Sequence, residues 1–463
     1  MVIPTILEKE QKFLGKVIFF FGSEAESMDF FRDKFTKMLD LLDASPVKTE
    51  FKIWIYRNYF LSAVRFLLTI HTLTATSLAA LDSLMARYLK KWCGLPNCVT
   101  LEVIHSHCAL NISKISDLYM LCHSTELANV RMVADQSVNT AVDVALLREA
   151  SNKKLSLRTE TSAQSVFSTA VTSLSSPSPS VKIIKAKVKA ILSSAIQVRS
   201  TEKLESLVLQ GGLLGQMVHL GATPEWSAQL TNMRSGSLKF MMNASINTLP
   251  TMDNLLRWGK TKSDKCKLCP ARDSTYHMLN TCSVGLLQGR FKWRHDNVLA
   301  FLFSLFKNCP GKTVTADLPE GNMYGGSTIS PNLLVTSKTP DLVIEEEEAV
   351  TIVELTIPFE PNLEARHRDK SLKYESFTTA ITTKKCTVLC VEIGSRGLVC
   401  PRNKITLKKL YNLSNKKISS KDIIFTCSSL SAVSSQFLFT QRKCAVWNPD
   451  TPVIRPAPTK HTQ

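Results

Sequence analysis

The stretch that determines the predicted fold begins at Pro340-Asp341-Leu342-Val343-Ile344. It continues through Glu345 to Glu348 and ends in Val350-Thr351-Ile352-Val353-Glu354-Leu355-Thr356-Ile357. Two runs rich in β-branched residues flank a polar turn, which is typical of a β-hairpin. A hairpin that turns between Glu347 and Glu348 places Asp341 directly opposite Glu354, because both lie equally far from the turn. The sequence therefore predicts a pair of carboxylates on one face of a sheet.

Such a pair has a specific chemistry. Carboxylates at directly opposed cross-strand positions have Cβ atoms about 4.5–5.5 Å apart. Both can then bind one hard divalent cation through oxygen, which also relieves their mutual repulsion. The four glutamates at the turn, from Glu345 to Glu348, are interpreted as a solvated loop.

Two further polar clusters lie near the carboxylate pair in the sequence. A helix is predicted from about Asn362 to Ile381 after Pro361, with Arg366, Lys370 and either Lys373 or Tyr374 on one face. A lysine held near a reacting phosphate can stabilise developing negative charge. The alternative is an ordinary charged helix surface. Arg294-His295-Asp296 is the other cluster, and its alternative is a polar helix face.

Upstream, Cys266, Cys269, His277 and Cys282 follow the spacing C-x2-C-x7-H-x4-C. Two cysteines three residues apart can bind one metal from a tight turn, and tetrahedral zinc accepts a Cys3His set. The alternative is two free thiols and an unrelated His–Cys pair. The basic residues around the cluster and the neighbouring aromatic residue are suited to phosphate contacts and base stacking: Lys265, Lys267, Arg272 and Tyr276.

The composition favours an anionic partner. The chain has 463 residues, a formal net charge of +18 and a pI near 9.3. Nucleic acid is the leading partner class and an anionic membrane surface the second. The N-terminal residues lack the pattern of a secretory signal. The apolar stretch from Phe66 to Leu81 is too short to span a bilayer and is interpreted as a buried helix. The thirteen cysteines are expected to be reduced apart from the cluster.

The domain organisation follows from changes in composition along the chain. A strand-like segment from Phe13 to Gly22 precedes helices with a basic surface that includes Lys90 and Lys91. A Ser/Thr/Pro-rich stretch is interpreted as a linker. Thr251 or Asp253 is expected to cap the helix that carries Trp258. The predicted regions are 1–150, a helical region; 151–181, the linker; 182–260, a basic helical region; 261–289, the zinc knuckle; 290–445, an α/β domain; and 446–463, a tail.

These motifs, in this order, resemble the C-terminal part of the polyprotein of site-specific LINE-type (non-LTR) retrotransposons that carry a restriction-like endonuclease. Trp54 to Tyr59 and Tyr88 to Pro96 resemble the reverse-transcriptase thumb, and Phe13 to Lys16 resembles the end of the palm. Ile246 to Trp258 and the Cys3His cluster resemble the linker and the zinc knuckle. Arg294-His295-Asp296, Asp341, Glu354, Lys370 with Lys373 and Tyr374, and then Val391 to Gly397, resemble the endonuclease motifs.

The resemblance implies a multi-domain fold. An α-helical N-terminal half with thumb-like and linker helices precedes a small zinc knuckle and a C-terminal α/β PD-(D/E)xK nuclease domain. The implied activity is nicking of target DNA, which primes reverse transcription of element RNA in the family. Asp341 and Glu354 would bind Mg²⁺ or Mn²⁺, and Lys370, or else Lys373, would act at the phosphate. The chain contains no Tyr-x-Asp-Asp polymerase motif, so a truncated or mis-split copy is expected.

The implied partners are DNA and element RNA, bound by a nuclear protein that is cytoplasmic in part. The resemblance implies no membrane and no small-molecule cofactor. The main alternative is a non-enzymatic zinc-knuckle protein that binds DNA or RNA and has an inactive nuclease domain. A membrane-surface protein is a third alternative, which the zinc cluster and the lack of a long basic amphipathic helix oppose.

Overall fold

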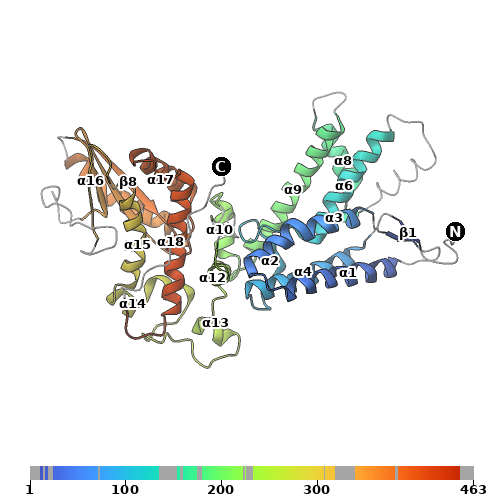
Figure 1. Ribbon diagram of the computed structural model, residues 1–463, viewed down its shortest axis with the longest axis horizontal. Coiled ribbons are helices and arrows are strands. Elements are labelled where there is room, and N and C mark those ends of the chain that lie inside the picture. Colours follow the sequence, from blue (N-terminus) through green and yellow to red (C-terminus); the bar gives the residue numbers. More distant parts are fainter. Residues whose placement is uncertain are drawn as a thin grey trace. The chain divides into compact units, whose positions relative to one another are not determined.

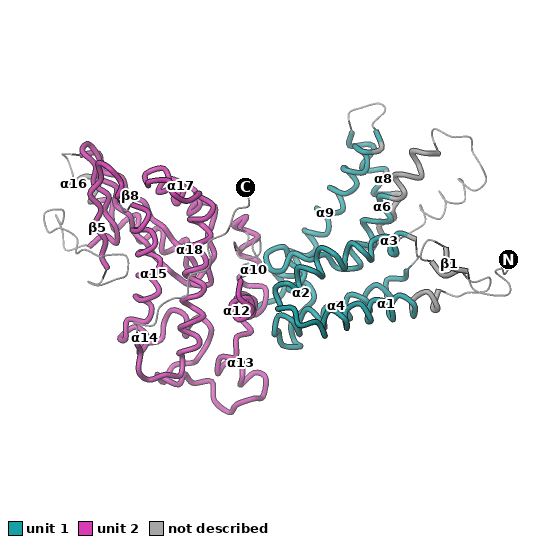
Figure 2. Tube along the Cα trace, viewed as in Figure 1, with its two compact units in different colours: residues 1–208 teal, residues 209–463 magenta. Residues whose placement is uncertain are grey.

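The computed structural model divides into two compact units, residues 1–208 and residues 209–463 (Figure 2). It describes residues 11–13, 16–18, 24–70, 73–134, 154–156, 160–174, 180–222, 225, 233–306, 308–318, 339–380 and 384–448. The described chain is mostly helical and contains one mixed four-stranded sheet. It is therefore an α-rich, multi-domain protein, in agreement with the coarse prediction from the sequence.

The first unit consists mainly of helices, with two short β-hairpins. Its elements are β1 (Gln11–Phe13), β2 (Lys16–Ile18), α1 (Glu24–Ala44), α2 (Thr49–Ile55), a π-helical turn (Tyr56–Phe60), α3 (Leu61–Ile70), α4 (Ala75–Cys93), α5 (Leu101–His105), α6 (Ile115–Ala134), β3 (Lys154–Ser156), β4 (Glu160–Ser162), α8 (Ala163–Thr172) and α9 (Val181–Glu205). β1 pairs with β2 in antiparallel fashion, and β2 and the last residue of β1 lie in the segment from Phe13 to Gly22 that was predicted to be strand-like.

The predicted helix from Phe66 to Leu81 is wrong, because the segment is divided between α3 and α4. The side chain of Thr74 accepts a hydrogen bond from the Ser77 amide at 3.2 Å and so begins a new helix. Phe66 is half exposed, whereas Leu81 is buried. The apolar composition of the segment therefore concealed a helix boundary that a capping threonine encodes.

The expected linker at 151–181 also differs from the structure. Ala163–Thr172 forms α8, which buries Val166 and Ala170 against Ile184 and Val188 of α9. Small and β-branched residues at helical spacing explain this packing, and the Ser/Thr-rich composition concealed it. Residues 175–179, with the Ser-Pro repeats, lie outside the described residues. α9 belongs to the first unit, so the boundary between the units falls inside the region 182–260.

The second unit contains the sheet and the helices that cover it (Figure 1). Its elements are α10 (Gly212–His219), α12 (Ser235–Ser245), α13 (Met252–Arg257), a π-helical turn (His277–Thr281), α14 (Ser283–Leu287), α15 (Arg290–Ser304), β5 (Thr313–Ala316), β6 (Leu342–Glu345), β7 (Ala349–Thr356), a 3-10 turn (Glu360–Asn362), α16 (Leu363–Ala380), β8 (Lys385–Glu392), α17 (Pro401–Leu413) and α18 (Ser420–Thr440). Thr251 caps α13, because its side chain accepts a hydrogen bond from the Asn254 amide.

The sheet has the order β5-β6-β7-β8, in which the first three strands are antiparallel and β8 runs parallel to β7. Alternate strand residues face opposite sides. Leu342, Ile344, Val353, Leu355, Leu389 and Val391 belong to the large core that also contains residues of α15, α17 and α18. Val343, Val350 and Ile352 pack instead against Tyr374 of α16. The sheet is therefore covered on both faces, and among the described residues α16 is the helix that covers the second face.

The predicted hairpin and its register are confirmed. Leu342 pairs with Val353 and Glu345 with Val350, and the Glu346 amide donates to the Ala349 carbonyl at 2.8 Å. Continuing this register by one residue places Asp341 opposite Glu354. The turn differs from a simple solvated loop, because Lys312 pairs with Glu346 and Lys384 with Glu345, each at 2.7 Å.

α18 holds the loop that follows β8. The hydroxyls of Ser428 and Ser431 donate to the carbonyls of Gly397 and Gly394, the latter at 2.8 Å. Gly397 has φ +85°, which favours glycine, and an added Cβ there would meet the Ser428 carbonyl at 2.7 Å. Within the described residues, α18 is also the one helix long and apolar enough to cross a membrane, and 56% of that window is buried inside the protein. Its serines and its burial fit a core helix.

Candidate metal centre and catalytic network

The Cys3His residues come together in the second unit. The four ligand atoms of Cys266, Cys269, His277 and Cys282 lie within 4.8 Å of one another. Cys269 Sγ is 3.2 Å from His277 Nε2 and 3.9 Å from Cys282 Sγ. A tetrahedral zinc with bonds of about 2.3 Å to sulfur and 2.0 Å to nitrogen separates its ligands by about 3.5–3.8 Å. The cluster can therefore hold a metal such as zinc.

Local structure explains why the ligands converge. The Cys266 amide donates to the Ala271 carbonyl at 2.8 Å and closes the turn that carries the first two cysteines. His277 opens a π-helical turn, and Cys282 is the N-cap residue of α14. Burial lowers the pKa of His277, which favours the neutral imidazole that binds metal. All thirteen cysteines are free of disulfides, as the sequence predicted.

The residues predicted to contact nucleic acid around this cluster differ in their surroundings. Lys267 is exposed, and Lys265 lies in an isolated β-bridge with Arg272. The Arg272 guanidinium is bound by Asp253, with Nε at 3.0 Å from the carboxylate. Tyr276 is 41% exposed and contacts the ring of Phe359. Arg272 is therefore already paired, while both lysines and the tyrosine present accessible surface.

The two thumb-region lysines named from the sequence lie on α4. Lys90 Nζ donates to the Asn97 carbonyl at 2.8 Å and helps to end the helix. Lys91 pairs with Asp43 of α1 at 2.6 Å. Both groups have structural contacts within the first unit, and Lys91 remains largely exposed.

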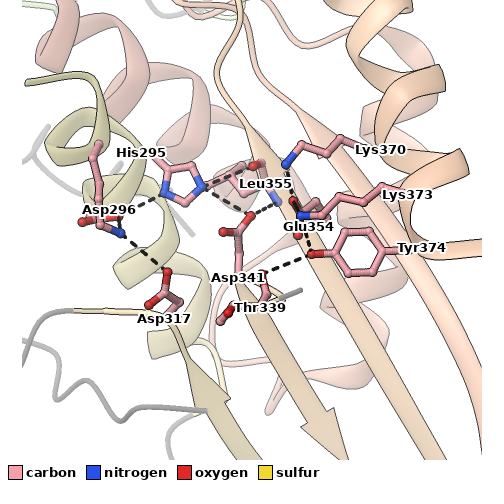
Figure 3. A network of polar contacts seen from close by, with 11 residues as sticks. His295, Asp296, Asp317, Thr339, Asp341, Glu354, Leu355, Lys370, Lys373 and Tyr374 are labelled. Carbon is pink, nitrogen blue, oxygen red and sulfur yellow. Dashed lines mark hydrogen bonds and ion pairs between the residues drawn. The ribbon is translucent and has the colours of Figure 1, made fainter. Parts of the chain in front are cut away.

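The carboxylate pair lies at the centre of a polar network (Figure 3). Glu354 is buried, and its Oε1 atom faces Lys370 and, at 3.4 Å, Lys373. Asp341 Oδ2 accepts a hydrogen bond from the Leu355 amide at 2.7 Å, so its carboxylate lies beside the Glu354–Leu355 peptide. The structure therefore brings together the two acids predicted from the hairpin and the lysines predicted from the helix.

On the other side of Asp341, His295 of α15 closes the network. His295 Nε2 lies 3.4 Å from Asp341 Oδ2, and Nδ1 lies 3.0 Å from Asp296 Oδ1. Burial alone would lower the pKa of His295, but the hydrogen bonds and charges of Asp296 and Asp341 outweigh it and raise the pKa to about 9. Burial would likewise raise the pKa of Asp341, yet His295, the Leu355 amide and Lys370 lower it. The two side chains therefore form an ion pair at neutral pH.

Tyr374 closes the network on the α16 side. Its hydroxyl donates to the Thr339 carbonyl at 3.2 Å and accepts from Lys373 Nζ at 3.0 Å. Burial and the neighbouring Glu354 raise the pKa of Tyr374. The phenol therefore stays protonated and holds Lys373 beside Glu354.

Two residues proposed for this site from the sequence do not join it. Arg294 is buried, and its guanidinium donates to the carbonyls of Leu279 and Ile357 and to the Ser435 hydroxyl, which indicates a structural role. Arg366 was placed on the same helix face as Lys370, but it is exposed and pairs with Asp369. The residue that faces the sheet one turn before Lys370 is His367, because α16 is rotated relative to the predicted face.

His367 belongs to a polar cluster that the sequence did not reveal. Its Nδ1 atom lies 2.9 Å from Glu392 Oε1, and Cys390 lies beside them. Glu392 and Cys390 come from β8, where Cys390 pairs with Glu354 in the parallel register. The signal that would have found them is this strand register, which a single sequence does not specify.

Comparisons with known proteins give no independent identification. No protein-family model matches the chain, and a search of curated proteins found no match.

Proposed function

We propose that the second unit is a metal-dependent DNA endonuclease of retrotransposon origin that hydrolyses a phosphodiester bond and nicks one strand. The observation that supports this most strongly is the arrangement of Asp341, Glu354 and Lys370. The hairpin register places Asp341 opposite Glu354, and Lys370 from the next helix reaches Glu354 Oε1, which leaves Oε2 for a metal ion. PD-(D/E)xK-type nucleases use two acids and a lysine. Here Thr356 stands at the usual position of the lysine, and Lys370 of the following helix takes its place.

The residues present fit a hard divalent cation. Glu354 Oε2 is buried and has no hydrogen-bond partner within the described residues, so one carboxylate oxygen is left for a ligand. Asp341 and Glu354 would hold Mg²⁺ or Mn²⁺, both of which prefer oxygen donors. When bound, such an ion supplies an activated water and neutralises charge on the phosphate.

The remaining residues of the network have separable roles. Lys370 would stabilise negative charge on the scissile phosphate, with Lys373 as the second candidate. Tyr374 positions Lys373 through its hydroxyl. His295 is held by Asp296 and fixes the Asp341 carboxylate. The two lysines contact Glu354.

We further propose that zinc in the Cys3His cluster folds a knuckle that binds DNA and element RNA through backbone phosphates. The exposed Lys265, Lys267 and Tyr276 support this, together with the net charge of +18. Such partners fit a protein that is located in the nucleus and, when bound to element RNA, partly in the cytoplasm.

One observation favours the second candidate, a binding protein with an inactive nuclease domain. The charge of Glu354 is already balanced by Lys370 and Lys373. A site that is satisfied by its own lysines can remain folded without ever binding a metal ion.

A nicking assay on supercoiled plasmid separates the two candidates. The full chain should convert plasmid to open circles with Mg²⁺ or Mn²⁺ and not with a chelator. Asp341→Asn and Glu354→Gln should abolish nicking and keep DNA binding. Glu347→Gln, at the exposed tip of the same hairpin, is the matched control and should leave nicking unchanged. Absence of metal-dependent nicking in the wild type, or nicking that survives both substitutions, would establish the binding protein instead.

A further inference from the structure

A second group of metal-ligating side chains lies beneath α16, outside the network around Asp341. One nitrogen of His367, the sulfur of Cys390 and one carboxylate oxygen of Glu392 all lie within 4.8 Å of one another. The three residues come from two elements, because His367 lies on α16 and the other two lie on β8. Their approach therefore depends on how this helix packs on this strand.

The carboxylate of this group has one oxygen without a hydrogen bond. Glu392 is fully buried, its Oε1 atom lies 2.9 Å from His367 Nδ1, and its Oε2 atom has no hydrogen-bond partner among the described residues. Arg402 Nη2 forms an ion pair with Oε2 at 3.7 Å, beyond hydrogen-bonding distance. The other terminal nitrogen of Arg402, Nη1, binds Glu364 at 2.9 Å. A buried oxygen without a hydrogen bond is costly, and a ligand would remove that cost.

We propose that His367, Cys390 and Glu392 form a second metal site, which takes a transition-metal ion of the zinc type. Imidazole nitrogen, thiolate sulfur and carboxylate oxygen are the three donor types that zinc accepts together. Mg²⁺ and Ca²⁺ prefer oxygen throughout, so a thiolate and an imidazole discriminate against them. The thiolate and carboxylate charges together balance the ion, and His367 is partly exposed, which leaves a route for its entry.

The site has a mechanical consequence for α16. Among residues 363–375 of this helix, whose side chains the structure describes, Leu363 and Tyr374 are buried, whereas Leu372 is 69% exposed. Polar contacts therefore hold much of the helix in place. His367 lies one turn before Lys370, so an ion shared with β8 would fasten the part of the helix that presents Lys370 to Glu354. The metal site itself does not depend on nuclease activity.

The test is the zinc content of the full chain, dialysed against buffered excess Zn²⁺ and measured by elemental mass spectrometry. The wild type should hold two zinc ions per chain, one of them in the Cys3His cluster. His367→Asn, Cys390→Ala and Glu392→Gln should each leave one. Loss of a residue that only supports a metal ligand lowers metal affinity by about 10–100-fold. Loss of a ligand itself should therefore lower the zinc affinity of the second site by at least about 100-fold.

Cys386→Ala is the matched control. Cys386 lies on the same strand and the same face as Cys390 but outside the cluster, so it should retain two ions. Cobalt substitution gives a second measurement, because the sulfur-to-cobalt absorption of one thiolate should disappear in Cys390→Ala alone. His367→Asn alters a partly exposed position, so it keeps the test valid if Cys390→Ala fails to fold. One zinc per wild-type chain, or two in His367→Asn and Glu392→Gln, would overturn the proposal.

Discussion

The Cys3His cluster and the Asp341 network both bring ionisable side chains together, but the charge of these side chains is balanced differently in the two sites. In the network every carboxylate faces a cation of the protein itself, since Lys370 and Lys373 face Glu354 and His295 faces Asp341. In the cluster three thiols and one imidazole face one another, and no lysine or arginine of the described residues forms an ion pair with them. We infer that the cluster needs a metal ion to fold, whereas the network folds first and uses a metal ion only for chemistry.

The largest effect is expected from removing zinc. Structural zinc contributes about 10–16 kcal/mol of apparent binding free energy in small zinc modules, and that energy is folding energy. Cys269→Ser should therefore unfold residues 261–289, which hydrogen exchange of the full chain would detect as lost amide protection. Cys444→Ser, at an exposed position, is the control and should change nothing. If the amides of residues 261–289 stay protected in a zinc-free Cys269→Ser protein, the cluster does not need a metal ion to fold.

The next effect concerns rate. Lys370→Ala should lower the nicking rate by about 10²–10³, because a fixed charge aimed at a developing negative charge is worth that much. DNA affinity should stay within about twofold, since one phosphate contact among many is lost. Arg366→Ala, one turn earlier but facing solvent, should leave the rate unchanged. Equal losses of rate and affinity in Lys370→Ala would make it a binding residue.

A smaller effect is expected on stability as a function of pH. The pKa of His295 is raised from 6.5 to about 9, so its ion pair contributes fully below about pH 6.5. That contribution, at most about 3 kcal/mol, is lost as the pH rises through 9. The lowered pKa of Asp341 reports the same pair and is not an additional contribution. Hydrogen exchange of α15 and β7 should therefore accelerate between pH 6.5 and 9 beyond the intrinsic rate, and His295→Asn should remove this excess.

The smallest effect is expected on the salt dependence of DNA affinity, which separates DNA binding from DNA cleavage. Each phosphate contact contributes about −0.9 to the slope of log affinity against log salt. Replacing both Lys265 and Lys267 with alanine should reduce the slope by about 2 and leave the rate at saturating DNA unchanged. Lys384→Ala also removes a positive charge, but from the hairpin turn, and it should leave the slope unaltered. A flat slope in the wild type would exclude phosphate contacts as the main source of affinity.

The sequence alone predicts the central ligands of both sites. The Cys3His ligands were all found, because they lie within one short segment whose spacing alone restricts the possible donors. The Asp341–Glu354 register was predicted for a similar reason, since a tight turn converts distance along the chain into distance across a hairpin. Both are local problems that a single sequence can solve.

The non-local parts were missed for identifiable reasons. α16 has few apolar residues, so no hydrophobic stripe marks its buried face, and the sequence favours Arg366 on the face where the structure has His367. Cys390 and Glu392 come to lie beside His367 through the parallel pairing of β7 with β8, two strands that the intervening helix separates in the sequence. The role of Arg294 as a buried donor to two carbonyls depends on the packing of α15 against the chain near Ile357.

The topology of the sheet also sets an order of assembly. β6 and β7 are joined by a turn of a few residues, and such hairpins form in about 1–10 μs. β8 can pair with β7 only after α16 has crossed over the sheet, and this larger loop makes the step slower. The two acids therefore meet before their lysines arrive. We expect a transient in which Asp341 and Glu354 repel each other, so that millimolar Mg²⁺ should speed refolding of the second unit even though the finished fold does not require it.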